Sequence, residues 1–206
     1  MPTVIGLDKT VTLLAELGHD LVETTLPAFT ADEGEAIGIV FSGATSWIIE
    51  YWVRKLGREP GPDELESLTR AFWEMGQTVS AGRYLAAIET LQRFSRRVAA
   101  FFGDYELFLN PTMSLPPLPL GVMVSTPEAL LHSVEVSAPS VAYSGVIANI
   151  TGQPAMSVPL HWSDAALPIG MHFLGRYADE ATLIRVASQL EEARPWAERR
   201  PPVFAS

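Results

Sequence analysis

No cysteine occurs in this 206-residue sequence. Disulfides, a catalytic thiolate and zinc–thiolate sites are therefore excluded. Lysine is almost as scarce, with only Lys9 and Lys55, and the formal net charge is -10. Because an acidic chain repels phosphate backbones, we expect no nucleic acid among its partners. The histidines lack the spacing of metal ligands, so we expect no metal ion and no cofactor; they are His19, His132, His161 and His172.

Targeting and membrane signals are also missing. The N-terminal residues "MPTVIGLDKT" have no basic segment followed by an apolar run, which argues against a secretory signal. We find no apolar stretch of membrane-spanning length, so we predict a cytoplasmic chain without a membrane partner. The length predicts a single domain over residues 1–206. Charged residues make up only 18% of the chain, which indicates a large buried fraction or a surface that another chain covers.

Helical periodicity accounts for much of the sequence. It predicts helices over residues 8–17, 32–56, 78–104, 138–152 and 179–193, and a shorter one after Pro62. The clearest apolar stripe consists of Tyr84, Ile88, Leu91, Val98 and Phe102. Arg93, Arg96 and Arg97 lie away from this stripe, and we interpret them as a solvated face rather than an anion site.

Four short segments have the composition of strands, over residues 19–27, 105–112, 154–160 and 168–175. A Pro-rich loop over residues 110–127 follows the second of them, and ordered loops of that length tend to be functional. Helices alternating with short strands predict the α/β class. Four strands form a small sheet for so many helices, which suggests that the chain is part of something larger.

Most catalytic signatures are absent from the sequence. It has no Gly-x-Ser-x-Gly elbow, no P-loop, no His-Glu-x-x-His and no dinucleotide-binding Gly-x-Gly-x-x-Gly. An unrecognised nucleophile would be Ser42, Ser144 or Ser157, but no base is spaced to activate any of them.

The C-terminal third carries a more specific pattern. "TGQPAMSVPLHW" is followed by "LPIGMHFLGRYADEATLIRVASQLEEARPW", and "YELFLNPTMSLPPLP" and "VAYSGVIANITGQPA" precede them in order. Together these segments resemble the C-terminal half of the amidase signature family, from Lys9 to Pro202. Within that family, they are most similar to the branch that includes hydrolases of aminohexanoate oligomers.

This resemblance implies a mixed sheet flanked by helices and hydrolysis of a carbon–nitrogen bond in a small amide. Members use a lysine, a serine in a cis peptide and a nucleophilic serine, which lie in a Gly- and Ser-rich signature in the N-terminal half. This sequence has no Ser-Ser and no Gly-Gly dipeptide, and neither Lys9 nor Lys55 has the context of the catalytic lysine. We therefore assign no catalytic residue.

What the resemblance does imply is a set of substrate-lining residues. They are Pro111, Thr112 and Met113 after the strand, and Tyr143, Ile147 and Asn149 in the helix before "TGQPA". These types suit a mostly apolar channel with a few polar anchors. The alternative is that Met113 and Ile147 are core residues and that Asn149 ties the turn.

Two functional hypotheses follow. In the first, the chain is the C-terminal part of an amidohydrolase, is inactive alone, and needs an N-terminal amidase half in trans to act on a small amide. In the second, it is a non-catalytic binding or assembly module that forms a homo-oligomer through its truncated face.

Overall fold

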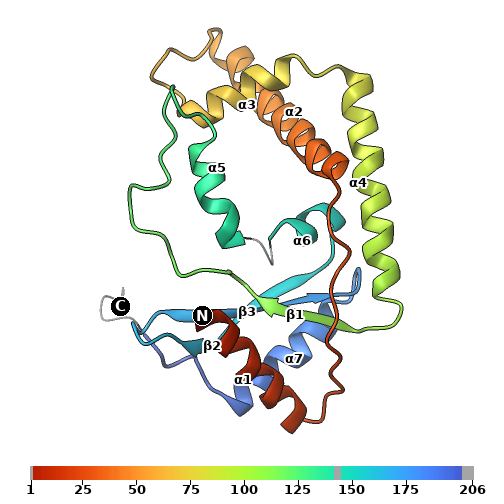
Figure 1. The fold of residues 1–206 in the computed structure, drawn as a ribbon. Coiled ribbons are helices and arrows are strands. Elements are labelled where there is room, and N and C mark those ends of the chain that lie inside the picture. The colour runs from red at the N-terminus through yellow and green to blue at the C-terminus, as the bar shows by residue number, and fades with distance from the viewer. Residues whose placement is uncertain (1, 142–144, 201–206) are drawn as a thin grey trace. The chain divides into compact units, whose positions relative to one another are not determined.

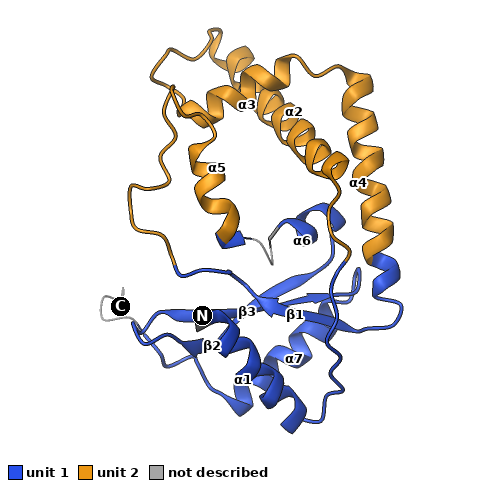
Figure 2. Cartoon of the chain, viewed as in Figure 1, with its two compact units in different colours: residues 1–26, 99–116, 140–206 blue, residues 27–98, 117–139 orange. Residues whose placement is uncertain are grey.

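The computed structural model describes residues 2–141 and 145–200, which divide into two compact units (Figure 2). The sheet unit comprises the described residues of 1–26, 99–116 and 140–206, and the helical unit comprises residues 27–98 and 117–139. Whether they form the single domain expected from the length stays a prediction. The elements are α1 (Pro2–Glu16), α2 (Ala31–Leu56), α3 (Ser67–Gln77), α4 (Ala81–Phe101), β1 (Leu107–Pro111), α5 (His132–Ser137), a 3-10 turn (Ala138–Val141), α6 (Gly145–Thr151), β2 (Ala155–Trp162), β3 (Pro168–Gly175) and α7 (Glu180–Ala193).

The sheet has three strands in the order β1-β3-β2 (Figure 1). β3 is central and pairs antiparallel with both neighbours; Asn110 lies opposite His172, and Ser157 lies opposite the same residue on the other side. The strands expected over residues 105–112, 154–160 and 168–175 are thus confirmed. In the described residues, however, the sheet is antiparallel throughout rather than mixed.

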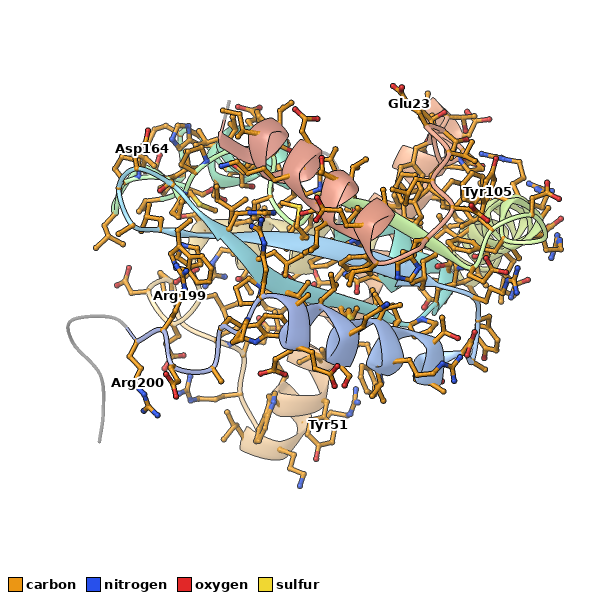
Figure 3. All side chains as sticks on the ribbon, turned by 90° about the horizontal axis from the view of Figure 1, so that it is seen from below. Glu23, Tyr51, Tyr105, Asp164, Arg199 and Arg200 are labelled. Carbon is orange, nitrogen blue, oxygen red and sulfur yellow. The ribbon has the colours of Figure 1, made fainter. Side chains whose placement is uncertain are left out.

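One face of this sheet builds the core. Strand residues alternate between faces, and Met171 and Phe173 of β3 point toward α1 and α7, which lie together on that side (Figures 1 and 3). Phe173 is only 1% exposed. The buried cluster comprises Leu13, Leu14, Val158, Leu160, Met171, Phe173, Leu183, Val186 and Leu190. The helix α6 lies on the opposite side of the sheet (Figure 1).

Both ends of α2 are fixed by local sequence. Thr30 caps its N-terminus by accepting a hydrogen bond from the backbone N–H of Glu33, whose carboxylate in turn accepts from the N–H of Thr30. At the other end Gly57 adopts a φ of 69°, a left-handed conformation that costs glycine little. The helix predicted over residues 32–56 is confirmed to within one residue.

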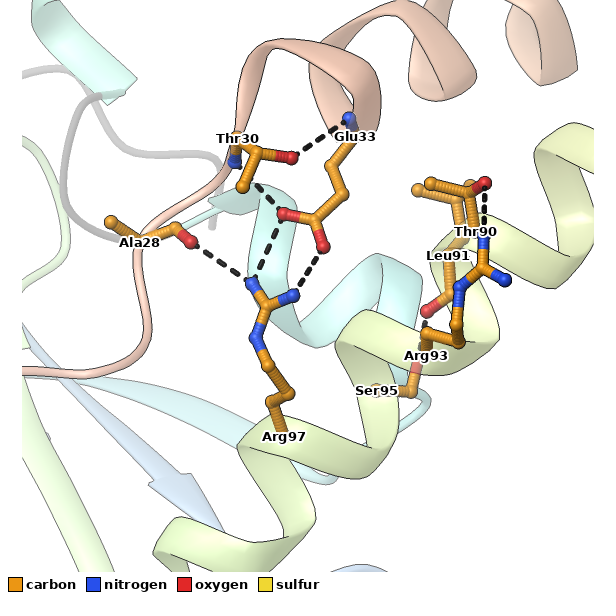
Figure 4. A network of polar contacts seen from close by, with 8 residues as sticks. All are labelled: Ala28, Thr30, Glu33, Thr90, Leu91, Arg93, Ser95 and Arg97. Atoms are coloured by element: carbon orange, nitrogen blue, oxygen red, sulfur yellow. Dashed lines mark hydrogen bonds and ion pairs between the residues drawn. The ribbon is translucent and has the colours of Figure 1, made fainter.

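An ion pair between buried Glu33 and exposed Arg97 joins α2 to α4 within the helical unit (Figure 4). Arg97 donates to both carboxylate oxygens of Glu33, at 2.6 and 3.1 Å, and to the carbonyl oxygen of Ala28. Hydrogen bonding by Arg97 lowers the pKa of Glu33 to about 2. Arg97 is exposed, as the predicted solvated face requires, but its ion pair with Glu33 was not predicted, because the two residues lie far apart in sequence.

Three other predictions need correction. Residues 19–27 form no strand, since their backbone finds no neighbouring strand to pair with. The first helix begins at Pro2, not at residue 8, because proline is well tolerated in a first helical turn. The helix predicted over residues 138–152 is a 3-10 turn and α6 in its described parts; residues 142–144 lie outside the described residues.

The length of α2 also corrects our prediction about membranes. This 26-residue helix is long and apolar enough to cross a membrane by length and composition, and only 17% of its most apolar window is buried. Core helices of soluble proteins can also be this long and apolar. The expectation of no membrane partner stays a prediction.

Candidate functional site

The face of the sheet that α1 and α7 leave uncovered carries a row of polar side chains. Because side chains alternate between the two faces of a strand, Asn110 and Thr112, which are two residues apart, lie on this same face. Gly170 and His172 of β3 and Ser157 of β2 share it, as the strand register and the side-chain contacts show. The site therefore consists of groups from all three strands.

Two hydroxyl groups meet across the central strand. Thr112 Oγ1 and Ser157 Oγ are 2.6 Å apart and hydrogen-bonded. They approach each other over Gly170, where an added Cβ would lie 2.6 Å from Ser157 Oγ and 2.7 Å from Thr112 Oγ1. A backbone hydrogen bond of 2.9 Å from Thr112 N–H to the Gly170 carbonyl holds β1 in place. Glycine is thus needed at residue 170 for the pair to form.

Beside this pair lies a buried histidine. His172 Nδ1 is 2.9 Å from Asn110 Oδ1, and both residues are buried. Because an amide oxygen only accepts, Nδ1 carries the hydrogen in this arrangement. Burial lowers the pKa of His172 below its ordinary value. Asn110 fixes the orientation of this imidazole, and no hydrogen bond among the described residues joins it to Ser157.

The lining residues predicted from the sequence fall into two groups. Pro111 is buried at the end of β1, Thr112 is in the hydroxyl pair, and Met113 is 42% exposed. In α6, Ile147 is half-buried and Asn149 is exposed. Tyr143 lies outside the described residues. Their role as a substrate lining stays a prediction.

A backbone hydrogen bond joins the segment that follows β1 to the segment that precedes α6. The N–H of Ser114 donates to the carbonyl oxygen of Ser140 at 2.8 Å, which links the loop after β1 to the 3-10 turn preceding α6. The hydroxyl oxygens of both serines are buried and have no hydrogen-bond partner among the described residues. Buried hydroxyl groups usually have a hydrogen-bond partner. Because these two serines lack one among the described residues, their hydroxyls are free to bind a further polar group.

Sequence reasoning missed the shared face of Asn110, Ser157, Gly170 and His172. It grouped His172 with histidines that lack metal-ligand spacing and Ser157 with serines that have no base spaced to activate them. Alternation within each strand was a usable signal, but it gives no register between strands. Only the pairing with β3 brings Ser157 beside Thr112.

Among the described residues, no base contacts the candidate nucleophiles Ser42 and Ser157. Ser157 is hydrogen-bonded to Thr112, and Ser42 Oγ is buried without a partner among the described residues. Ser144 lies outside them. Lys55 stands over the ring of Tyr51 at 5.3 Å. No group of three or more potential metal ligands occurs in the described part of the chain.

Comparison with known proteins defines the class. Residues 5–184 match the Amidase family, so this chain belongs to the amidase family. It is 32% identical over 193 residues to a protein of Mycobacterium tuberculosis (strain ATCC 25618 / H37Rv) named amidase AmiB2, an alignment that covers 93% of this chain and 39% of that protein. It is 28% identical over 199 residues to the 6-aminohexanoate-cyclic-dimer hydrolase of Paenarthrobacter ureafaciens, and this alignment covers 91% of this chain and 39% of that protein.

Solved structures agree on the fold. The structure of 6-aminohexanoate cyclic dimer hydrolase superimposes with a TM-score of 0.82 at 24% identity, covering 98% of this chain and 43% of that one. A bacterial aryl acylamidase of the amidase signature family gives 0.70 at 18% identity, covering 94% and 42%. The chain thus spans about two fifths of its relatives' length. The predicted α/β class and amidase signature fold are confirmed, and the coverage is consistent with a C-terminal portion of that fold.

Proposed function

We propose that this chain is the C-terminal, substrate-lining part of an amidohydrolase and that it is inactive alone. The catalytic lysine and serines would come from outside these 206 residues, in the N-terminal amidase half. The observation that carries the proposal is the family match over residues 5–184 combined with a coverage of only 39% of the relatives. The missing Ser-Ser and Gly-Gly dipeptides support it.

In the complete enzyme, this chain would position a small amide. The end of β1 supplies a hydroxyl from Thr112 beside the apolar side chain of Met113, and α6 adds Ile147 and Asn149. Such a mixture orients a substrate by a few polar contacts while apolar groups exclude water. The attacking serine and the donors that stabilise the oxyanion would belong to the partner half.

The test compares the chain alone with a reconstituted pair. The purified chain is treated with a fluorophosphonate and analysed by intact mass, and its hydrolysis of small amides is measured. It is then co-expressed with the N-terminal part of an AmiB2-like relative. We expect no adduct alone, and both adduct and hydrolysis in the pair, with the adduct on the partner.

Controls separate the outcomes. Thr112→Val and Ser157→Ala, which remove the hydroxyl pair, should raise KM in the reconstituted pair more than they lower kcat. A stoichiometric adduct on the chain alone would overturn the proposal, and Ser42→Ala and Ser157→Ala would locate the nucleophile. A stable pair without hydrolysis would also contradict it.

A second candidate function rests on exposed apolar side chains. In α2, the large side chains of Phe41, Trp47, Trp52 and Leu56 are each more than half exposed. Apolar patches of this kind mark interaction surfaces. An assembly module would form a homo-oligomer, so sedimentation velocity across a wide concentration range should then show a rising mass, whereas the first proposal does not require one.

A further inference from the structure

A groove in the helical unit has no role in the proposed hydrolase. It lies between α2, the end of α3 and the start of α4, and has a volume of about 900 Å³. Its walls include Ser46, Trp47 and Glu50 of α2, Gly76 of α3, and Tyr84 and Leu85 of α4. This volume is within the ordinary range of small-molecule sites.

Two glycines shape the groove. A Cβ at Gly76 would overlap the carbonyl oxygen of Ser42, so α3 can pack directly on the backbone of α2 only because residue 76 has no side chain. A Cβ at Gly43 would lie 3.2 Å from Cδ2 of Tyr84, whose ring therefore rests on the helix backbone. These contacts bring α3 and the ring of Tyr84 directly onto the backbone of α2.

A single carboxylate lies in this otherwise mostly apolar groove. Glu50 Oε1 accepts a 3.1 Å hydrogen bond from the hydroxyl of Ser46, which is itself buried. None of the ion pairs among the described residues involves Glu50. Arg83 pairs with Glu35 at 2.8 Å, and Lys55 lies over Tyr51. Arg54, four residues after Glu50 on α2, forms none of the ion pairs among the described residues.

We propose that this groove binds a small organic cation, namely a primary ammonium on an alkyl or aryl body. The ammonium would pair with the carboxylate of Glu50, and the apolar body would lie against Trp47 and Tyr84. Charged hydrogen bonds are stronger than neutral ones, and aromatic faces attract cations. The net charge of -10 also raises the local concentration of cations and disfavours anions. This site is independent of the proposed hydrolase function.

The probe that tests this site is 2-phenylethylammonium, titrated into the full ¹⁵N-labelled chain. We expect saturable amide shifts confined to the groove, with Gly43, Gly76 and Tyr84 among them. The neutral analogue 2-phenylethanol and the anion 3-phenylpropanoate should bind at least about tenfold more weakly, the equivalent of one charge-assisted contact.

Two matched variants test whether Glu50 recognises the charge of the ammonium. Glu50→Gln should weaken binding of the ammonium about tenfold and leave binding of the alcohol unchanged. Glu74→Gln is the control, since it removes the same charge from an exposed position of α3 outside the groove. The spectra of each variant also report whether it is folded.

Several results would overturn the proposal. These are equal binding of the ammonium and the alcohol, an unchanged affinity in Glu50→Gln, or shifts that never saturate. A concentration-dependent dimer that protects the groove and abolishes the shifts would assign it instead to a second copy of the chain.

Discussion

The sheet unit and the helical unit bury their apolar side chains to different extents. In the sheet unit, α1 and α7 close over one face of three strands, and the whole contiguous core cluster belongs to it. In the helical unit, Phe94 is buried and stacks on Phe29, with ring centroids 4.3 Å apart. Yet the same unit leaves Phe41, Trp47 and Trp52 largely in solvent.

This difference follows from how a sheet and long helices bury their apolar faces. A sheet with helices on one face forms a core from its own chain, because layers of complementary faces bury each other. Long amphipathic helices without a partner for every face keep apolar area exposed. Under the function proposed above, the helical unit is the part whose stability would depend more on a partner chain.

The largest expected effect contrasts a large side chain from each unit. Phe173→Ala should destabilise the sheet unit by about 3–5 kcal/mol, because it opens a cavity in a close-packed core. Trp47→Ala should change the helical unit by no more than about 0.5 kcal/mol, since Trp47 is 66% exposed. Hydrogen exchange read separately on β3 and α2 checks both values. A similar loss in the two variants would remove the contrast.

A glycine contact tests how the helical unit is held together. Gly76→Ala should destabilise it by about 2–3 kcal/mol, because the added methyl overlaps the backbone of Ser42. Gly38→Ala is the control: nothing lies near its Cβ, so better helix propensity should stabilise α2 by up to about 1 kcal/mol. Denaturant midpoints of the two variants should therefore move in opposite directions. If both rose, α3 would not be closely packed on α2.

Acid should weaken the sheet unit first. Burial, followed by the charges of Arg194 and Lys9, lowers the pKa of His161 to about 4. The unfolded chain binds the proton near the ordinary pKa of about 6.5, so stability is full above that pH and falls as the pH drops toward 4. We expect the loss of stability over this pH range to be roughly 1–2 kcal/mol, which is less than the full pKa shift implies because solvent screens the charge.

His161→Gln should flatten this pH dependence, measured as exchange of β2 amides between pH 7 and 4. The hydrogen bond between His161 Nε2 and Thr10, at 2.8 Å, anchors α1 on the sheet, so the variant should also be less stable at pH 7. An unchanged slope in the variant would show that another group causes the acid loss.

The smallest effect concerns the ion pair of the helical unit. Glu33→Gln should cost about 1 kcal/mol at pH 7, because it removes the charge that Arg97 contacts while keeping an acceptor for the helix cap. Glu35→Gln, which breaks an exposed pair with Arg83, should have almost no effect.

The Glu33–Arg97 pair and His161 affect stability in different pH ranges. Hydrogen bonding by Arg97 holds the pKa of Glu33 at about 2, below its ordinary 4.5, so the pair stabilises the fold above pH 4.5 and is lost as the pH falls toward 2. Acid titration followed by the exchange of α4 amides measures it. The idea fails if Glu35→Gln has the larger effect.

Sequence reasoning succeeded where the signal was local. The residues 168–175 were predicted as a strand and form β3, and α7 begins after Asp179, whose side chain accepts from the N–H of Thr182. It failed over residues 19–27, whose alternation looked like a strand, because a strand also requires a neighbour for its hydrogen bonds. It likewise missed the ion pair between Glu33 and Arg97, which are 64 residues apart.

The sequence by itself determined the family, the α/β class, and the caps and turns that begin and end most elements, because these depend on residues close together in the chain. The tertiary structure alone decided which strands pair, that Gly170 brings Thr112 and Ser157 together, and that Gly76 lets α3 pack on α2. The physical reason is that register and close approach depend on contacts between segments distant in sequence, which no local pattern specifies.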